Sequence, residues 1–215
     1  MNSTHSLLNT LKSRGTNPAL TWYGPHERIE LSGKVVAMHL SKISQYLRHD
    51  LGVDSDSHLI IDLPPHWKSI LWVLAGHIAG CQVVNDTNDA GWNDVVITAT
   101  PESPVIETTN LALTLQSLAF EWPGTLPNGY DDAAAAPMVY PDVVDLSLIP
   151  NMTIEVTEPP QSDQTCYAVI ADDPIELARM FAGAILNDAA LVIMTPENDM
   201  CSIIVAENAS KWDRI

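Results

Sequence analysis

One pattern of apolar residues occurs twice in this chain, 108 residues apart, and it constrains the fold more than any other feature. In the first copy a buried-type strand, His58 to Leu63, leads through two prolines into an apolar helix from about Trp67 to Ala79 and then into a strand, Cys81 to Val84. The equivalent positions are Ile61 and Val169, Trp72 and Met180, Gly76 and Ala184, Val84 and Val192, Thr87 and Thr195, and Val95-Val96-Ile97 and Ile203-Ile204-Val205. Strand, helix, strand is the order of a βαβ unit. The chain is therefore predicted to be an α/β protein with mostly parallel sheets flanked by helices, in which residues 58–99 and 166–207 are two such units.

The segments around these units have their own signals. Two short β-type runs, Leu20 to Tyr23 and Arg28 to Leu31, flank a Gly-Pro turn and predict a hairpin. Ser32 then has the character of a helix N-cap, and Gly52 that of a stop. Alternating leucines at 111, 113 and 115 suggest one antiparallel strand. We expect a single domain, with a first βαβ subdomain over about 18–120, an irregular proline-rich connection over about 121–164 and a second βαβ unit over about 165–210.

Charge excludes several classes of partner. The net charge is −17, and between Ser69 and Ser210 the only Lys or Arg is Arg179, among twenty Asp and Glu residues. Nucleic acids and anionic membranes both require clusters of Lys or Arg, so neither is expected as a partner. We expect Arg179 to pair with a carboxylate about one helical turn back, such as Glu176 or Asp172.

The three cysteines and the amino terminus indicate a cytoplasmic protein. The cysteines are far apart and odd in number, without a CxxC pair or zinc-site spacing. Residues 1–14 lack the apolar core and cleavage site of a signal peptide. Asp86 opens a loop that begins like a calcium site, but Ala90 and Ile97 stand at two ligand positions, so no metal and no cofactor are predicted.

Several stretches of the chain carry a resemblance to a known family. They are Pro18-Ala-Leu-Thr-Trp-Tyr, Leu31-Ser32, Leu51-Gly-Val-Asp, Leu59-Ile-Ile-Asp-Leu-Pro64, Val73-Leu-Ala-Gly76 and Ala79-Gly80-Cys-Gln-Val-Val84. Together they resemble the start of the AMP-binding, acyl-adenylate-forming family, and Cys166 to Met194 is similar to that family's next βαβ unit. The resemblance implies an acetyl-CoA-synthetase-like N-terminal fragment, that is, a short, truncated homologue.

The parts of the family that this sequence lacks bear on activity. The family's phosphate loop is a Ser/Thr/Gly-rich run ending in Pro-Lys-Gly, whose amides and lysine hold the phosphates of ATP. The corresponding stretch, Thr153 to Thr165, has no glycine and no lysine but contains Glu155, Glu158 and Asp163. On this resemblance we expect no counterpart, after Ile215, of the family's adenine and ribose motifs or of its C-terminal domain. The resemblance thus implies a fold without adenylating activity.

Candidate ligand-binding residues lie where strands of the two units lead into helices, the usual ligand position in open α/β sheets. In the first unit these are Pro65, His66 and Trp67, although the prolines could simply begin the helix while Trp67 packs on the core. Asp86 follows the next strand. In the second unit Asp172 lies in the equivalent turn. The next residue, Asp173, is expected to be a helix N-cap. Thr195 occupies the position equivalent to Thr87.

No nucleophile or dinucleotide motif supports a hydrolase or a dehydrogenase. We therefore expect a non-catalytic, AMP-binding-like domain that binds either a small apolar or CoA-like ligand or a protein partner, and we assign no catalytic residue. The alternative is an enzyme of another class, with a site at the strand ends near His66 and Asp86.

Overall fold

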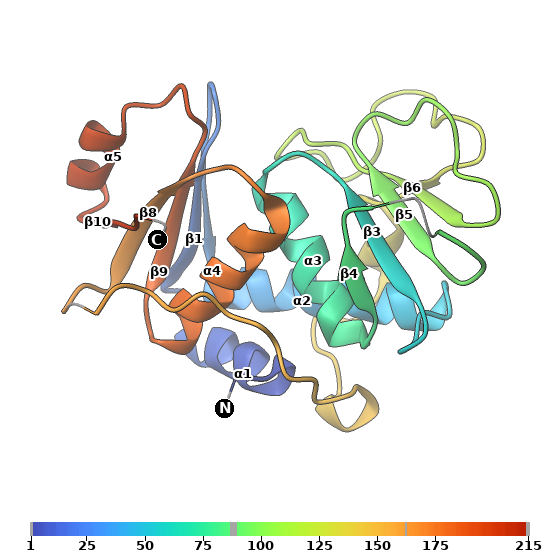
Figure 1. The fold of residues 1–215 in the computed structure, drawn as a ribbon, viewed down its shortest axis with the longest axis horizontal. Helices are drawn as coiled ribbons and strands as arrows, with labels where there is room; N and C mark the ends of the chain where they lie inside the picture. Colours follow the sequence, from blue (N-terminus) through green and yellow to red (C-terminus); the bar gives the residue numbers. More distant parts are fainter. Residues whose placement is uncertain (1, 87–89, 162, 214–215) are drawn as a thin grey trace.

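Two mostly parallel sheets lie on either side of a layer of helices (Figure 1). The computed structural model describes residues 2–86, 90–161 and 163–213. The first sheet has the order β10-β8-β9-β1-β2, with β1 (Pro18–Tyr23), β2 (Arg28–Ser32), β8 (Cys166–Ile170), β9 (Ala190–Met194) and β10 (Ser210–Lys211). The second has the order β4-β3-β5-β6-β7, with β3 (His58–Asp62), β4 (Gln82–Val84), β5 (Val95–Thr98), β6 (Thr109–Ala112) and β7 (Asp131–Asp132). The α/β class with mostly parallel sheets is confirmed.

The helices between the sheets form the centre of the core. They are α1 (Thr4–Arg14), α2 (Gly33–His49), α3 (Trp67–Ala79) and α4 (Pro174–Leu186), while α5 (Met200–Ala206) lies outside the first sheet (Figure 1). α3 packs against both α2 and α4. It is buried on all sides apart from half-buried His77, and its sequence is accordingly apolar all round. Within the described residues no helix is long and apolar enough to cross a membrane.

The predicted hairpin and the helix after it are present. β1 pairs with β2 antiparallel, with Leu20 opposite Leu31. α2 begins after Ser32, whose hydroxyl accepts a hydrogen bond from the amide of Val35 at 3.4 Å. The helix ends at His49, and Gly52 adopts a positive φ of 67° two residues past the C-cap. The N-cap and the stop signal were therefore read correctly from the sequence.

The two predicted βαβ units have the expected order and parallel pairing, but their equivalence ends early. β3 and β8 begin 108 residues apart, at residues 58 and 166, and so do β4 and β9, at residues 82 and 190. The next stretch differs, because Ile203 to Val205 lies in α5 where a strand equivalent to β5 was expected. Every residue of β5 is buried, whereas in α5 only Ile203 is buried and Val205 is 81% exposed. A segment buried on one side only, with Asp199 capping its first turn, forms a surface helix.

The strand expected near Leu111 is also present, but it runs parallel to β5 rather than antiparallel. Residues 99–108 connect the end of β5 to the beginning of β6, at the opposite end of the strands, without forming a helix. Asn110 holds this connection closed, because its side chain accepts a hydrogen bond from the amide of Val105 and donates one to the carbonyl of Val105, both at 2.9 Å. Alternating leucines indicate a strand but do not specify its direction.

The expected subdivision of the chain does not follow the two sheets. β1 pairs with β9 in parallel, so residues 18–32 belong to the sheet of the second unit rather than to that of the first. Residues 121–164 are largely irregular, as expected, with the two-residue β7 and the short 3-10 helices η1 (Ala136–Val139) and η2 (Leu146–Leu148). The pairing of β1 with β9 joins parts of the chain about 170 residues apart, which no local sequence signal encodes.

Candidate functional site: an apolar cavity between α2 and α3

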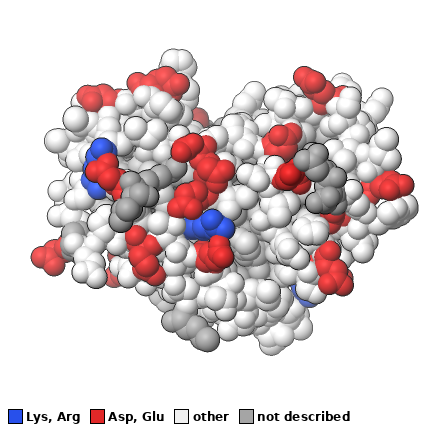
Figure 2. Space-filling view, viewed as in Figure 1, with Lys and Arg blue, Asp and Glu red and all other residues white. Residues whose placement is uncertain are grey.

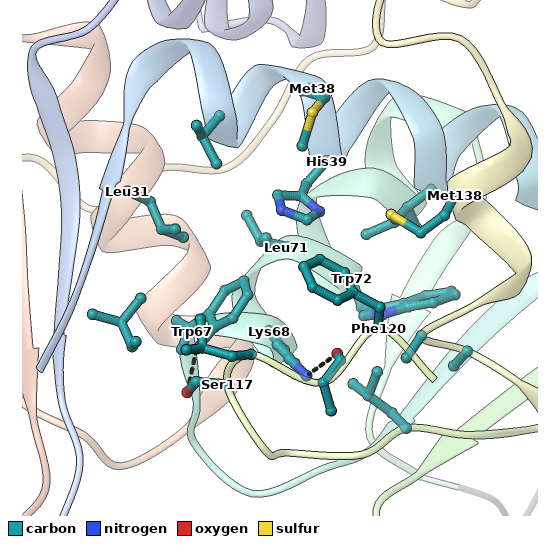
Figure 3. A pocket seen from close by; sticks show the side chains of 18 residues that line it. Leu31, Met38, His39, Trp67, Lys68, Leu71, Trp72, Ser117, Phe120 and Met138 are labelled. Atoms are coloured by element: carbon teal, nitrogen blue, oxygen red, sulfur yellow. Dashed lines mark hydrogen bonds between the residues drawn. The ribbon is translucent and has the colours of Figure 1, made fainter. Parts of the chain in front are cut away.

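An apolar cavity of about 300 Å³ lies between α2 and α3 (Figure 3). β2 closes one side, and the segments 113–120 and 133–138 close the others. Most of the lining is aliphatic, aromatic or thioether, represented by Leu31, Met38, Leu71, Trp72, Phe120 and Met138. Phe120 is 73% exposed and extends over the cavity. A space of this size and character suits a small apolar molecule rather than water.

The helical periodicity of α2 explains how this cavity forms. Val36, Leu40 and Leu47 lie on one face and are fully buried in the main core. His39 lies three residues after Val36, and it reaches the cavity between α2 and α3 (Figure 3). One helix thus contributes both to the core and to the cavity wall.

Lys68, in the first turn of α3, fixes one wall of the cavity. Its side chain is buried, and Nζ donates to the carbonyls of Thr114, Gln116 and Ala119 at 2.8, 2.6 and 3.4 Å. An ammonium group has three protons to donate, so these carbonyls use its full capacity. Burial lowers the pKa of Lys68 to about 8, although Glu27 opposes the shift. The lysine is therefore a tie for the 114–119 segment.

Lys42, on α2, fixes the opposite wall in the same way. Its Nζ donates to the carbonyls of Met138, at 3.2 Å, and of Tyr140, and it lies 3.0 Å from a carboxylate oxygen of Asp142. These contacts hold η1, and with it Met138, against α2. Two buried cations of a strongly acidic protein thus serve to shape the cavity.

His39 differs from both lysines. Its ring meets that of Trp67 edge to face, with the centroids 6.0 Å apart. Burial, followed by the positive charges of Lys68 and Lys42, lowers the pKa of His39 to about 4. The imidazole is therefore neutral at physiological pH, with one N–H donor and one bare nitrogen acceptor.

A short chain of hydrogen bonds runs from the cavity wall to the β1–β2 turn. Trp67 Nε1 donates to Ser117 Oγ at 3.0 Å, and Ser117 Oγ donates to Glu27 Oε1 at 2.6 Å. Glu27 Oε1 also lies 3.9 Å from Nε2 of His66. These hydrogen bonds join the β1–β2 turn to the 113–120 segment and fix the ring of Trp67 against the cavity.

Of the three residues predicted at the first strand-to-helix turn, one lines the cavity. Trp67 is part of its wall, while half-buried Pro65 and buried His66 are not. His66 caps α3 instead, because its Nδ1 accepts from the amide of Lys68 at 3.2 Å, and its ring lies 5.0 Å from that of Trp22. Burial, followed by the charge of Lys68, lowers the pKa of His66 to about 3.

The other predicted residues lie elsewhere. Asp86 and Asp172 are exposed, and Thr195 is half-buried, accepting a hydrogen bond from the side chain of Asn198 at 2.9 Å. The predicted cap of α4 is confirmed, since Asp173 accepts a hydrogen bond from the amide of Glu176 at 2.7 Å. Residues 87–89 of the loop that resembles a calcium site lie outside the described residues. Among the residues that are described, no three His, Cys, Asp or Glu side chains could together hold a metal ion.

Sequence reasoning missed His39, Lys68 and Phe120 as residues of the site. Two of them had a signal: His39 continues the apolar face of α2, and Lys68 is a lone cation in an otherwise apolar helix. Phe120 had none, because its position depends on how the 113–120 segment folds back over α3.

The first part of the 153–165 segment, which was expected in place of a phosphate loop, contacts α4 through Glu155 and Thr157. The amide of Thr157 donates to the carbonyl of Arg179 at 3.2 Å. Arg179 in turn pairs with Glu155 at 2.6 Å, and with Glu176 at 3.7 Å as predicted. A Cβ atom on Gly183 would lie 2.0 Å from the carbonyl oxygen of Thr157, so only glycine allows this close approach.

Comparison with solved structures gives a consistent set of neighbours. The acyl-CoA synthetase of Brucella canis superimposes with a TM-score of 0.69 at 13% identity, covering 95% of this chain and 46% of that one. The NpsA N-terminal subdomain of Klebsiella oxytoca, solved with 3-hydroxybenzoyl-AMSN, superimposes with a TM-score of 0.63 at 12% identity, covering 97% of this chain and 59% of that one. An artificially fused NpsA–ThdA adenylation–PCP di-domain from Klebsiella oxytoca gives a TM-score of 0.60 at 14% identity, covering 97% of this chain and 42% of that one. This chain has the fold of an adenylating-enzyme N-terminal subdomain.

The chain thus spans about half the length of these adenylating enzymes and acyl-CoA synthetases. Identity at this level establishes the shared fold and leaves the chemistry to the residues of the site. No protein-family model and no curated protein matches the chain.

Proposed function

We propose that this chain is a binding domain that holds one small apolar molecule between α2 and α3 and does not adenylate it. The observation that carries the proposal is the cavity itself, because most of the residues that line it from both helices and β2 are apolar. Transfer of about 100 Å² of apolar ligand surface out of water would contribute roughly 2.5 kcal/mol. The fold supports the same reading, since the NpsA subdomain of similar fold was solved with an aryl-bearing ligand.

Charge argues against adenylation. Adenylation brings a carboxylate to the α-phosphate while pyrophosphate leaves, so fixed cations and amide donors must stabilise the growing negative charge. Glu155, Glu158 and Asp163 occupy the segment where such groups would be needed, and Arg179 is held by two carboxylates. Figure 2 shows acidic side chains spread over one face of the molecule with few basic ones among them.

The alternative of an enzyme site near His66 and Asp86 has weaker support. A general base is effective when its pKa lies near the working pH. Burial lowers the pKa of His66 to about 3, and its Nδ1 is occupied by the cap of α3. Its imidazole is thus a poor proton acceptor at neutral pH.

A titration with naphthalene tests the proposed function. Because an apolar cavity of about 150 Å³ holds benzene, a two-ring hydrocarbon suits this one. Val35→Trp, on the cavity wall, should fill the space and abolish binding. Val205→Trp, on the exposed face of α5, is the matched control and should bind as the wild type does. Absence of binding to the wild type, or equal binding by both variants, would contradict the proposal.

A further inference from the structure

The cavity has few polar side chains, and two of them, Lys68 and Ser117, use their hydrogen-bonding groups within the protein. Lys68 donates to three carbonyls. Ser117 accepts from Trp67 and donates to Glu27. Within the described part of the chain, the ring of His39 meets that of Trp67 but forms no hydrogen bond. His39 is thus the lining side chain whose donor and acceptor are both available to a ligand (Figure 3).

A polar group that faces an apolar cavity needs a partner there. The ring of His39 is half-buried, so water reaches it until a ligand fills the cavity. Once the ligand has displaced that water, a donor or acceptor left without a partner costs about 1–3 kcal/mol. A ligand that supplies the partner recovers this cost, whereas a pure hydrocarbon does not. The neutral imidazole can donate through one nitrogen and accept through the other, which is the pattern that a hydroxyl group complements.

We propose that His39 selects the ligand, and that the preferred class is a neutral aromatic molecule of about two rings with one hydroxyl group, which hydrogen-bonds to the imidazole. This inference rests on the proposed function and goes further, because it names the recognising residue and the chemical class. The rings lie against Leu71, Trp72 and Phe120, and the hydroxyl lies toward α2.

The same geometry disfavours a carboxylate at this position. A carboxylate has about four lone-pair sites to satisfy, and one neutral imidazole supplies a single donor. The protons of Lys68 and Lys42 are already directed to carbonyl oxygens and to Asp142. An anion would therefore enter an apolar space with most of its hydration lost and not replaced.

Three probes of one shape test the inference: naphthalene, 2-naphthol and 2-naphthoate, titrated into the full chain at pH 7. The wild type should bind 2-naphthol about 3- to 10-fold more tightly than naphthalene, the factor that one net hydrogen bond contributes. His39→Phe keeps an aromatic ring and should remove this preference while naphthalene still binds. His39→Gln keeps a donor and an acceptor and should restore part of it. Circular dichroism of each variant establishes that it folds.

The other outcomes distinguish failure of this inference from failure of the proposed function. If naphthalene binds but 2-naphthol binds no better, or if His39→Phe retains the preference, the inference is wrong and the proposed function stands. If 2-naphthoate binds most tightly, the assignment of a neutral ligand is overturned. If no probe binds the wild type, the proposed function fails and the inference fails with it.

Discussion

At the scale of single residues, Lys42, Lys68 and Arg179 show two different roles of basic side chains in this protein. Lys42 and Lys68 are buried and tie backbone segments to helices. Arg179 is 41% exposed and pairs with two carboxylates on the surface. The sequence identified Arg179 and its partner Glu176, but the shorter pair with Glu155 comes from a segment that reaches α4 only in the folded chain.

Arg179→Ala should barely change stability. Exposed ion pairs contribute about 0.2–0.5 kcal/mol, because water and salt screen them. Glu155 is 79% exposed at its side chain, which places the pair in this class. Urea unfolding at neutral pH measures the change. A loss of several kcal/mol would contradict this assignment and indicate a functional or effectively buried cation.

His39 should make the protein less stable in acid. Its folded pKa is about 4 against the usual 6.5, so between these values the unfolded chain binds more protons. The free energy of unfolding therefore falls as pH decreases from about 6.5 to about 4, and stability from this group is fully present above 6.5. Between pH 7 and pH 4.5 the wild type should lose about 2 kcal/mol more than His39→Phe. Equal losses in denaturant unfolding would show that His39 is solvated.

At the scale of elements, close contacts between segments distant in sequence fix the walls of the site and the position of the chain around Thr157. The tie between Lys68 and the 114–119 segment holds one wall of the cavity. The close approach of Thr157 to Gly183 places the chain around Thr157 on α4. Both contacts can be tested by single substitutions.

Lys68→Met should loosen the cavity wall. The substitution keeps much of the apolar stem but leaves three carbonyls without their donor, which costs about 1–3 kcal/mol. Hydrogen exchange of residues 113–120 should accelerate. Lys34→Met, at an exposed position on α2, is the control and should leave exchange there unchanged. Unaltered protection in Lys68→Met would contradict the role of this lysine as a tie.

Gly183→Ala should destabilise the chain although alanine is the better helix former. Alanine gains up to about 1 kcal/mol in a helix interior, but its Cβ would lie 2.0 Å from the Thr157 carbonyl oxygen. Forcing the segment away should cost about 1–3 kcal/mol. Gly91→Ala, whose Cβ would meet no atom within 4 Å, is the control. Thermal unfolding measures the effect, and a melting temperature of Gly183→Ala equal to that of the wild type would contradict the close approach.

The sequence predicted those elements whose signals are local. A few neighbouring residues are enough to predict each of three features: the N-caps Ser32 of α2 and Asp173 of α4, and the hairpin turn before Arg28. It failed where burial decides the outcome, as when Ile203 to Val205 became a helix. The candidate site was predicted only through Trp67, because the cavity is formed by segments that the chain brings together from residues 29 to 138.

At the scale of the whole molecule, the chain has the fold of an adenylating-enzyme N-terminal subdomain. Its residues 153–165, which the family resemblance aligns with the phosphate loop, include three acids and neither glycine nor lysine. We therefore expect no pyrophosphate exchange with aryl, fatty or amino acids in the presence of magnesium-ATP. We also expect no ATP binding tighter than about 10 μM, which corresponds to roughly −7 kcal/mol. Exchange above background with any acid would contradict a purely binding role.

The most direct test of the central claim uses the tryptophans as reporters of where a ligand lies. Trp67 and Trp72 line the cavity, whereas Trp92 is 79% exposed and does not. On titration of ¹⁵N-labelled protein with naphthalene, the indole N–H resonances of Trp67 and Trp72 should shift in a saturable manner, while that of Trp92 stays in place. A ligand that shifts Trp92 and leaves Trp67 and Trp72 unchanged, or that shifts none of the three, would contradict a binding site between α2 and α3.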